Sequence, residues 1–290
     1  MPSPRSTALI GLGIGLGAGV LSGVFGVGGG SLIVPGLVLL LHRRQHEASA
    51  TSLAAILITA PAALIPFLLA GQVAVVPALL LCCGSLLGAY VGAGAMRRVP
   101  AAALRRGFAA VLALVVVRLL LADGADSQNA TVAIDLATAA GLVTLGLVAG
   151  LLSALLGVGG GIVIVPALVL LFGFGPAAAA GTSLLVIVPT ALVGAARHTR
   201  SGYVDWRLGI VIGAAGAVGG PLGAALALNA DSALVRRAFA VFLALIVVQL
   251  LRPATSSQRI AEGHDAGDAV GPIRGAEDQH AAGVDGQSGT

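Results

Sequence analysis

The chain has 290 residues, of which 57% are hydrophobic, 10% charged and 3% aromatic, and its mean hydropathy is +1.02. A soluble protein this apolar could not cover its surface with polar groups, because ordinary globular domains are about 25% charged. The composition excludes a cytosolic enzyme, a nucleic-acid-binding protein and a disordered chain, and it predicts an all-α polytopic protein with the lipid bilayer around it.

Ten apolar segments follow one another along the chain. They lie near 7–27, 31–41, 50–70, 73–95, 101–121, 132–156, 160–172, 179–196, 206–228 and 233–252. Crossing a bilayer core of about 30 Å takes about 20 helical residues, so we expect about eight full spans. The segments at 31–41 and 162–172 give helices of only roughly 16 Å, so we expect short broken or re-entrant helices there.

An internal repeat organises these segments. The block GVGGGSLIVPGLVLLL at 26–41 returns as GVGGGIVIVPALVLLF at 157–172, at an offset of 131, and Thr51-Ser52-Leu53 returns as Thr182-Ser183-Leu184 at the same offset. We therefore expect a transmembrane domain over 1–252, built from two five-segment repeats at 7–122 and 138–253. Because the first segment is part of the repeat, it is not read as a cleaved signal peptide.

The charges predict how the repeats are oriented. The net charge is +4, but residues 1–252 hold fourteen Arg and six acidic residues, whereas the acidic, Gly- and Ala-rich tail at 253–290 is expected to be disordered and cytoplasmic. Cytoplasmic loops are enriched in Arg. If each repeat crosses the membrane an odd number of times, all Arg of 1–252 are cytoplasmic except Arg236, Arg237 and the intramembrane Arg118. The repeats are therefore predicted to be inverted, with both termini cytoplasmic.

Three consecutive glycines interrupt each repeat, as Gly28, Gly29, Gly30 and as Gly159, Gly160, Gly161. Such a run breaks a helix, and a broken backbone persists in lipid only when it is buried in protein or lines a cavity. The short helix that follows presents free N–H groups and the positive end of its dipole. Inverted repeats bring two such ends together, which predicts a binding site for a small anion. The alternative is a packing kink without a ligand.

Polar and small residues add two further expectations. Thr51, Ser52, Thr182 and Ser183 are expected either to donate hydroxyls to the anion or to act as helix N-caps. Glycines spaced four apart, such as Gly15, Gly19 and Gly23 or Gly84, Gly88 and Gly92, are expected to let helices approach closely in lipid. His42, His46, Glu47 and His198 are expected on solvated loops.

Other chemistry is not indicated. The chain has no Walker A sequence and no G-x-S-x-G, so we expect neither ATP-driven pumping nor an enzyme, and no catalytic residues, metal or cofactor. We expect the protein to bind a small anionic substrate and no nucleic acid. The sequence does not decide whether the protein forms a homo-oligomer.

The paired GVGGG-x-x-x-VP blocks, the downstream Thr-Ser pairs and the glycine-rich third long segment resemble the sulfite exporter TauE/SafE family of membrane transporters. The resemblance covers nearly all of 7–252. It implies a bacterial inner-membrane carrier that moves, and often exports, sulfite, sulfoacetate or related sulfur-containing or organic anions.

The leading hypothesis is a secondary carrier of a small anion that works by alternating access. The alternative is a passive anion channel or facilitator of the same fold, and a membrane scaffold without transport is a third reading.

Overall fold

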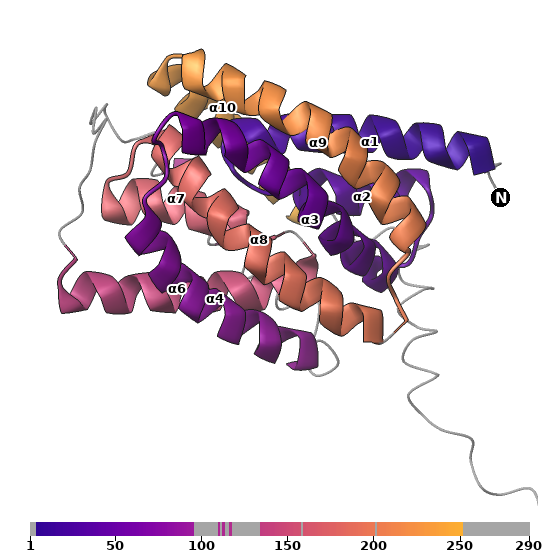
Figure 1. Cartoon of the computed structure of the whole chain (residues 1–290), viewed down its shortest axis with the longest axis horizontal. Coiled ribbons are helices and arrows are strands. Elements are labelled where there is room, and N and C mark those ends of the chain that lie inside the picture. Colours follow the sequence, from indigo (N-terminus) through magenta and orange to yellow (C-terminus); the bar gives the residue numbers. More distant parts are fainter. Residues whose placement is uncertain are drawn as a thin grey trace, which may run out of the picture. The chain divides into compact units, whose positions relative to one another are not determined.

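The protein is helical throughout the part that its structure, a computed structural model, describes. This part comprises residues 4–95, 110, 112–113, 116–117, 134–157, 159–200 and 202–251. It contains nine helices and no strand: α1 (Pro4–Phe25), α2 (Gly30–Leu40), α3 (Gln45–Leu69), α4 (Val75–Ala95), α6 (Leu136–Leu156), α7 (Gly161–Phe172), α8 (Pro176–Arg200), α9 (Trp206–Asn229) and α10 (Ser232–Leu251) (Figure 1).

The observed helices follow the predicted segments closely. Among the described residues, six helices are long and apolar enough to cross a membrane, namely α1, α3, α4, α6, α8 and α9. The chain is therefore a multi-pass membrane protein. Helices α2 and α7, of 11 and 12 residues, are the two predicted short helices. The segment near 101–121 lies largely outside the described residues, as does the tail at 253–290, and the expectation of about eight spans stays a prediction.

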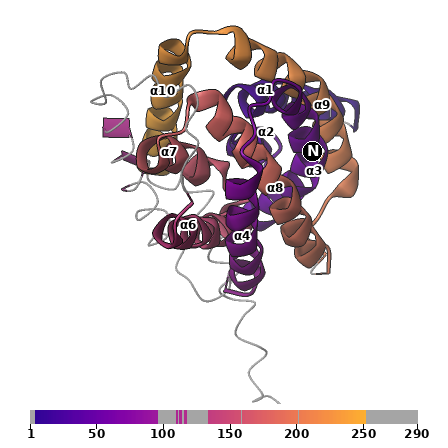
Figure 2. The same cartoon turned by 60° about the vertical axis from the view of Figure 1, so that its left-hand side comes forward.

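Helices α3 and α8 pack against each other at the centre of the helical domain, with α1 and α9 on one side and α4 and α6 on the other (Figures 1 and 2). They run in opposite directions: Leu53, early in α3, contacts Gly194 late in α8, while Phe67, late in α3, contacts Gly181 early in α8. The centre of this contact is apolar, and both Ile56 and Ile187 are fully buried there.

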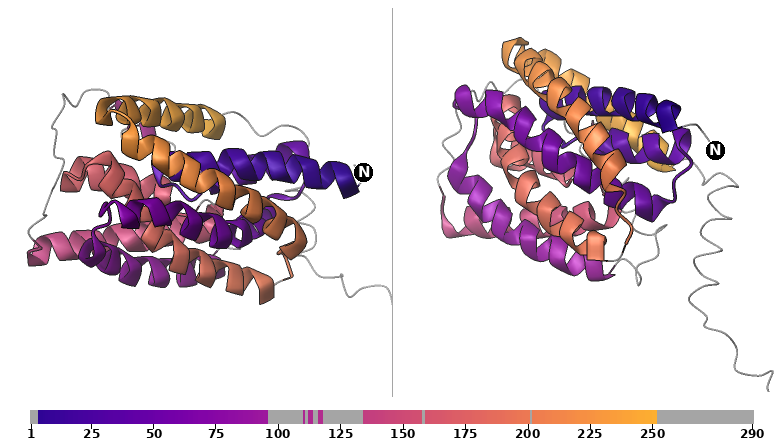
Figure 3. Two further views of the ribbon diagram at one scale, coloured as in Figure 1. Left: turned by 45° about the horizontal axis from the view of Figure 1, so that its top comes forward. Right: turned by 45° about the vertical axis from the view of Figure 1, so that its right-hand side comes forward.

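The outer pairs, α1 with α9 and α4 with α6, each join the two predicted repeats (Figure 3). The first long helix of one repeat packs along the fourth helix of the other. A β-carbon at Gly15 would overlap the carbonyl oxygen of Ile212, and a β-carbon at Gly146 would overlap that of Leu81. Gly15 and Gly146 are 131 positions apart, and so are Leu81 and Ile212, so the same contact occurs in both helix pairs. The prediction that the spaced glycines serve close helix packing is confirmed.

We expect Gly15→Ala to lower the free energy of unfolding in detergent by about 2 kcal/mol, because its methyl group would overlap main-chain atoms of α9 that cannot rotate away. Gly13→Ala is the matched control. Gly13 lies on the exposed side of the same helix with nothing within 4 Å of its β-carbon position, so this variant should be as stable as the wild type or more stable. Equal stability of the two variants would contradict the packing described here.

Candidate functional site

The two glycine runs are helix breaks in the structure. Helix α1 ends at Phe25 and α2 begins at Gly30, and in between Gly26, Gly28 and Gly29 have φ angles of 68°, 80° and 79°. Gly157, Gly159 and Gly160 repeat this pattern with φ angles of 69°, 84° and 77°. A side chain in this left-handed region is strained, so the conformation depends on glycine. The predicted breaks are confirmed.

After each break the short helix turns back along the helix that precedes it. A β-carbon at Gly29 would lie 2.9 Å from the carbonyl oxygen of Ala18, and one at Gly36 would lie 3.0 Å from Cδ1 of Ile14. In the second half, Gly160 lies against Ala149 in the same way. Helix α2 therefore returns toward the end from which α1 started, and α7 returns along α6.

The two breaks meet beside the middle of α3 and α8. A β-carbon at Gly161 would lie 2.6 Å from the carbonyl oxygen of Gly26, and one at Gly159 would lie 3.5 Å from that of Val27. Ile56 and Ile187, which are equivalent residues of the two halves, flank the breaks from α3 and α8. The sequence reasoning placed these two breaks together, and the structure does so too.

The serines of the Thr-Ser pairs fasten each break to the opposite half. Ser183 Oγ donates to the carbonyl oxygen of Gly26 at 2.9 Å, and Ser52 Oγ donates to that of Gly157. Both serines are fully buried. A carbonyl freed by a break has no water to bond in an apolar interior, so these hydroxyls satisfy groups that would otherwise cost free energy.

The threonines of these pairs bind the turns that precede α9 and α4. Thr51 Oγ1 accepts a hydrogen bond from the N–H of Asp205 at 3.1 Å, and Thr182 Oγ1 accepts one from the N–H of Ala74 at 3.0 Å. The reading of the Thr-Ser pairs as N-caps is wrong. Helix α3 begins at Gln45 and α8 at Pro176, so the pairs lie inside helices.

Helix α3 begins before the apolar segment that hydropathy marks. Its first residues, 45–49, include polar side chains, and this part of the helix packs against the second break. Ser49, for example, is fully buried beside Gly157.

Each short helix begins with N–H groups that its own ladder does not use. The N–H groups of Leu32 and Ile33 bond to the carbonyl oxygen of Gly29, whereas those of Gly30 and Ser31 precede the first helical acceptor. Helix α7 starts in the same way after Gly160, with Val163 and Ile164 as the first donors. Neither short helix has a side-chain cap at its N-terminus. A positively polarised helix N-terminus is a structure that holds small anions in other proteins.

An ion pair lies at one end of this arrangement, and the equivalent positions at the other end are uncharged. Arg43 Nη2, before α3, lies 2.9 Å from Oδ2 of Asp205, which also caps α9 by accepting from the N–H of Leu208. The two side chains are 40% and 32% exposed. At the offset of 131, the equivalents of Arg43 and Asp205 are Phe174 and Ala74. Sequence reasoning missed this pair because its members are 162 residues apart.

The position of His198 differs from the one that the sequence predicts. It was expected on a solvated loop, but its side chain is only 4% exposed and its Nε2 lies 3.4 Å from the carbonyl oxygen of Ala154, close to the second break. The reason is that α8 continues to Arg200, which keeps His198 within the helical packing.

Two serines that the sequence reasoning missed also lie next to the breaks. Ser22 and Ser153 each precede the first break residue by four positions and match at the repeat offset. That match was the signal by which they could have been found.

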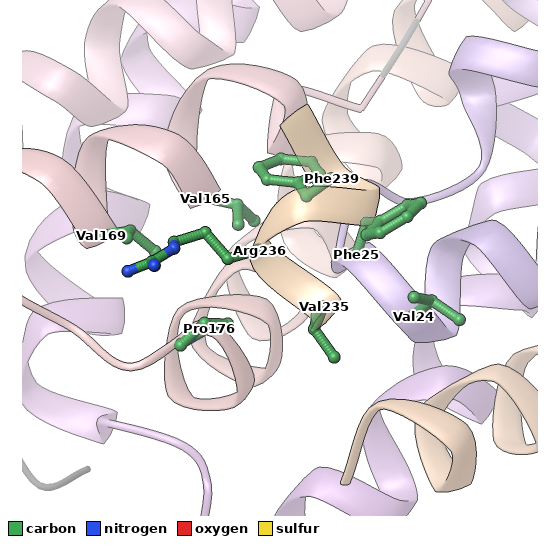
Figure 4. A pocket seen from close by; sticks show the side chains of 8 residues that line it. All are labelled: Val24, Phe25, Val165, Val169, Pro176, Val235, Arg236 and Phe239. Carbon is green, nitrogen blue, oxygen red and sulfur yellow. The ribbon is translucent and has the colours of Figure 1, made fainter. Parts of the chain in front are cut away.

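Two hollows of the described part are lined mainly by apolar side chains. A cavity of about 10 Å³ among Val24, Phe25, Val165 and Phe239 has one polar lining group, the half-buried Arg236 (Figure 4), and holds roughly one water molecule. A groove of about 480 Å³ between α3, α4 and α8 is apolar, with Cys82 as its one thiol.

Comparison with known proteins adds independent evidence. A family model described as sulfite exporter TauE/SafE matches residues 1–119 and 142–281. The chain is 27% identical over 260 residues to the probable membrane transporter protein YunE of Bacillus subtilis, covering 82% of this chain and 95% of that protein. It is 29% identical over 195 residues to the probable membrane transporter protein YdhB of the same organism, covering 66% of this chain and 78% of YdhB.

A probable membrane transporter protein of Xylella fastidiosa strain Temecula1 is 26% identical over 250 residues, covering 84% of this chain and 94% of the relative. No solved structure matches the chain.

Proposed function

Because the chain belongs to the sulfite exporter TauE/SafE family and is a multi-pass membrane transporter, we propose that it is a secondary carrier of a small anion that works by alternating access. One observation carries this proposal: the N-termini of the two short helices, α2 and α7, meet between the halves of the protein, and neither has a side-chain cap. The family name makes sulfite the first substrate to test and export the direction, and sulfoacetate and related sulfur-containing or organic anions, which the resemblance implies, come next.

In this proposal the anion is bound by backbone N–H groups of the two breaks, Gly28–Gly30 and Gly159–Gly161. The hydroxyls of Thr51, Ser52, Thr182 and Ser183 already bond to main-chain groups, so they act as positioning residues that hold the breaks and the neighbouring turns. The N-terminus of a helix carries a partial positive charge and not the full charge of a cationic side chain. It can therefore bind an anion and still release it.

The halves are proposed to be inverted repeats, each presenting the site to one side of the membrane. The opposite directions of α3 and α8 support this, as do the glycine contacts that recur at the repeat offset. A protein with two equivalent halves can exchange their conformations, which exposes one site alternately to the two sides. We place the protein in the bacterial inner membrane with both termini in the cytoplasm.

Counterflow separates a carrier from a channel of the same fold. Proteoliposomes loaded with unlabelled sulfite and diluted into a trace of radiolabelled sulfite should transiently accumulate the label, because a carrier exchanges one anion for another. The same assay applies to sulfoacetate and acetate. Flux that never exceeds equilibration and does not saturate would identify a passive facilitator instead.

The same vesicles test where the anion binds. Gly159→Ala adds a methyl group between the two breaks, where Ile56 Cδ1 at 3.4 Å still leaves room for it, and we expect flux to fall at least about tenfold. Gly71→Ala is the matched control, since Gly71 also has a positive φ, 67°, but lies in a turn with nothing within 4 Å. Wild-type flux in folded Gly159→Ala would place the site elsewhere.

The ion pair between Arg43 and Asp205 is proposed to hold the cytoplasmic mouth closed. Arg43→Gln should raise the labelling rate of a cysteine at Ser49, behind that mouth, in a background without Cys82 and Cys83. A partly exposed pair contributes up to about 1 kcal/mol, so the increase should be about two- to fivefold. The reagent should reach this cysteine in inside-out vesicles and not in right-side-out vesicles.

Glu47→Gln is the control for this experiment. Glu47 lies 3.7 Å from the same guanidinium but does not connect the two halves, so its loss should leave the labelling rate unchanged. Equal labelling rates in Arg43→Gln and the wild type would show that the ion pair does not hold the mouth closed. Labelling from the opposite side would overturn the proposed orientation.

A further inference from the structure

Two equivalent serines next to the breaks have buried hydroxyls without a partner. Ser22 in α1 is 0% exposed and Ser153 in α6 is 1% exposed, and neither Oγ has a hydrogen-bond partner within the described part of the chain. A buried hydroxyl without a partner costs free energy, so such groups in a protein require an explanation.

Their position follows from the stripe of residues that faces each short helix. Along α1, Ile14 lies against Gly36 and Ala18 lies against Gly29, so Ser22, one turn further on, faces the break itself. In the second half the contact is direct. Cβ of Ser153 lies 3.5 Å from the β-carbon position of Gly160, the residue immediately before α7.

Ser31 Oγ, in the first turn of α2, is also buried without a partner in the described part, but four other buried hydroxyls behave differently. Thr59 and Thr190 donate to the carbonyl oxygen four residues earlier in their own helices, as hydroxyls in apolar helices commonly do. Ser52 and Ser183 donate to the breaks. Ser22 and Ser153 make neither kind of bond, although each lies beside a helix end that has free N–H groups.

We propose that the hydroxyls of Ser22 and Ser153 are direct ligands of the transported anion, each donating a hydrogen bond to one of its oxygens beside the N–H groups of α2 and α7. This inference rests on the proposed function and names side chains for its site. Each half contributes one hydroxyl, so an oxyanion can exchange a ligand of one half for that of the other as the protein changes conformation.

Substitution by alanine tests the proposal, because it removes a group that bonds to nothing in the empty protein. We expect Ser22→Ala and Ser153→Ala to unfold at the wild-type temperature or higher without anion. Each should raise the KM for counterflow about tenfold, since a hydrogen bond to a charged ligand is lost. The probe is whichever of sulfite, sulfoacetate and acetate the wild type takes up saturably, and the same anion should raise the unfolding temperature of the variants less than that of the wild type.

Ser85→Ala is the matched control. Ser85 is also buried, but its hydroxyl lies 2.8 Å from that of Thr190, so its removal should lower the unfolding temperature and leave KM unchanged. If Ser22→Ala and Ser153→Ala keep the wild-type KM, or unfold at lower temperature without anion as Ser85→Ala does, the hydroxyls are structural and the inference fails. If the wild type itself moves none of the three anions, the proposed function fails, and this inference fails with it.

Discussion

A helix that breaks inside an apolar environment must find new partners for its main-chain groups, and this constraint shapes the whole protein. The carbonyl oxygens of Gly26 and Gly157 are satisfied by Ser183 and Ser52, which belong to the opposite half of the chain. Each break is therefore hydrogen-bonded to the opposite half of the chain. Each short helix then begins with N–H groups outside its own ladder, so one local interruption both joins the halves and forms the candidate site.

The halves are interlocked beyond the breaks. Helix α1 packs on α9 and α4 packs on α6 through faces of small residues, and the turns before α4 and α9 are held by Thr182 and Thr51. These contacts are duplicated at the repeat offset, which gives two similar ends to one central site. The ends differ in charge, however. Arg43 and Asp205 form an ion pair at one end, whereas the equivalent positions at the other end are the uncharged Phe174 and Ala74.

Much of this architecture could be predicted, because two signals are local. Hydropathy gave the helices to within a few residues, and the two runs of three consecutive glycines each broke an apolar helix, whereas the pair Gly219-Gly220 lies inside the continuous helix α9. The repeat offset then predicted that the breaks are equivalent. The N-cap interpretation of Thr51 and Thr182 failed because hydropathy marks the apolar part of a helix, whereas α3 starts earlier, at the polar residue Gln45.

The sequence by itself determined that this is a helical membrane protein with two related halves, and it determined where the helix of each half breaks. Both results depend on local properties, namely the composition of a segment and the conformations open to consecutive glycines. Only the tertiary structure decided what those breaks meet. The bond from Ser52 to Gly157, the pairing of Arg43 with Asp205 and the lack of a partner for Ser22 and Ser153 among the described residues all depend on how residues far apart in the chain are placed. Hydrogen bonds and ion pairs require atoms to lie within a few ångströms of each other, and sequence spacing alone does not specify that proximity.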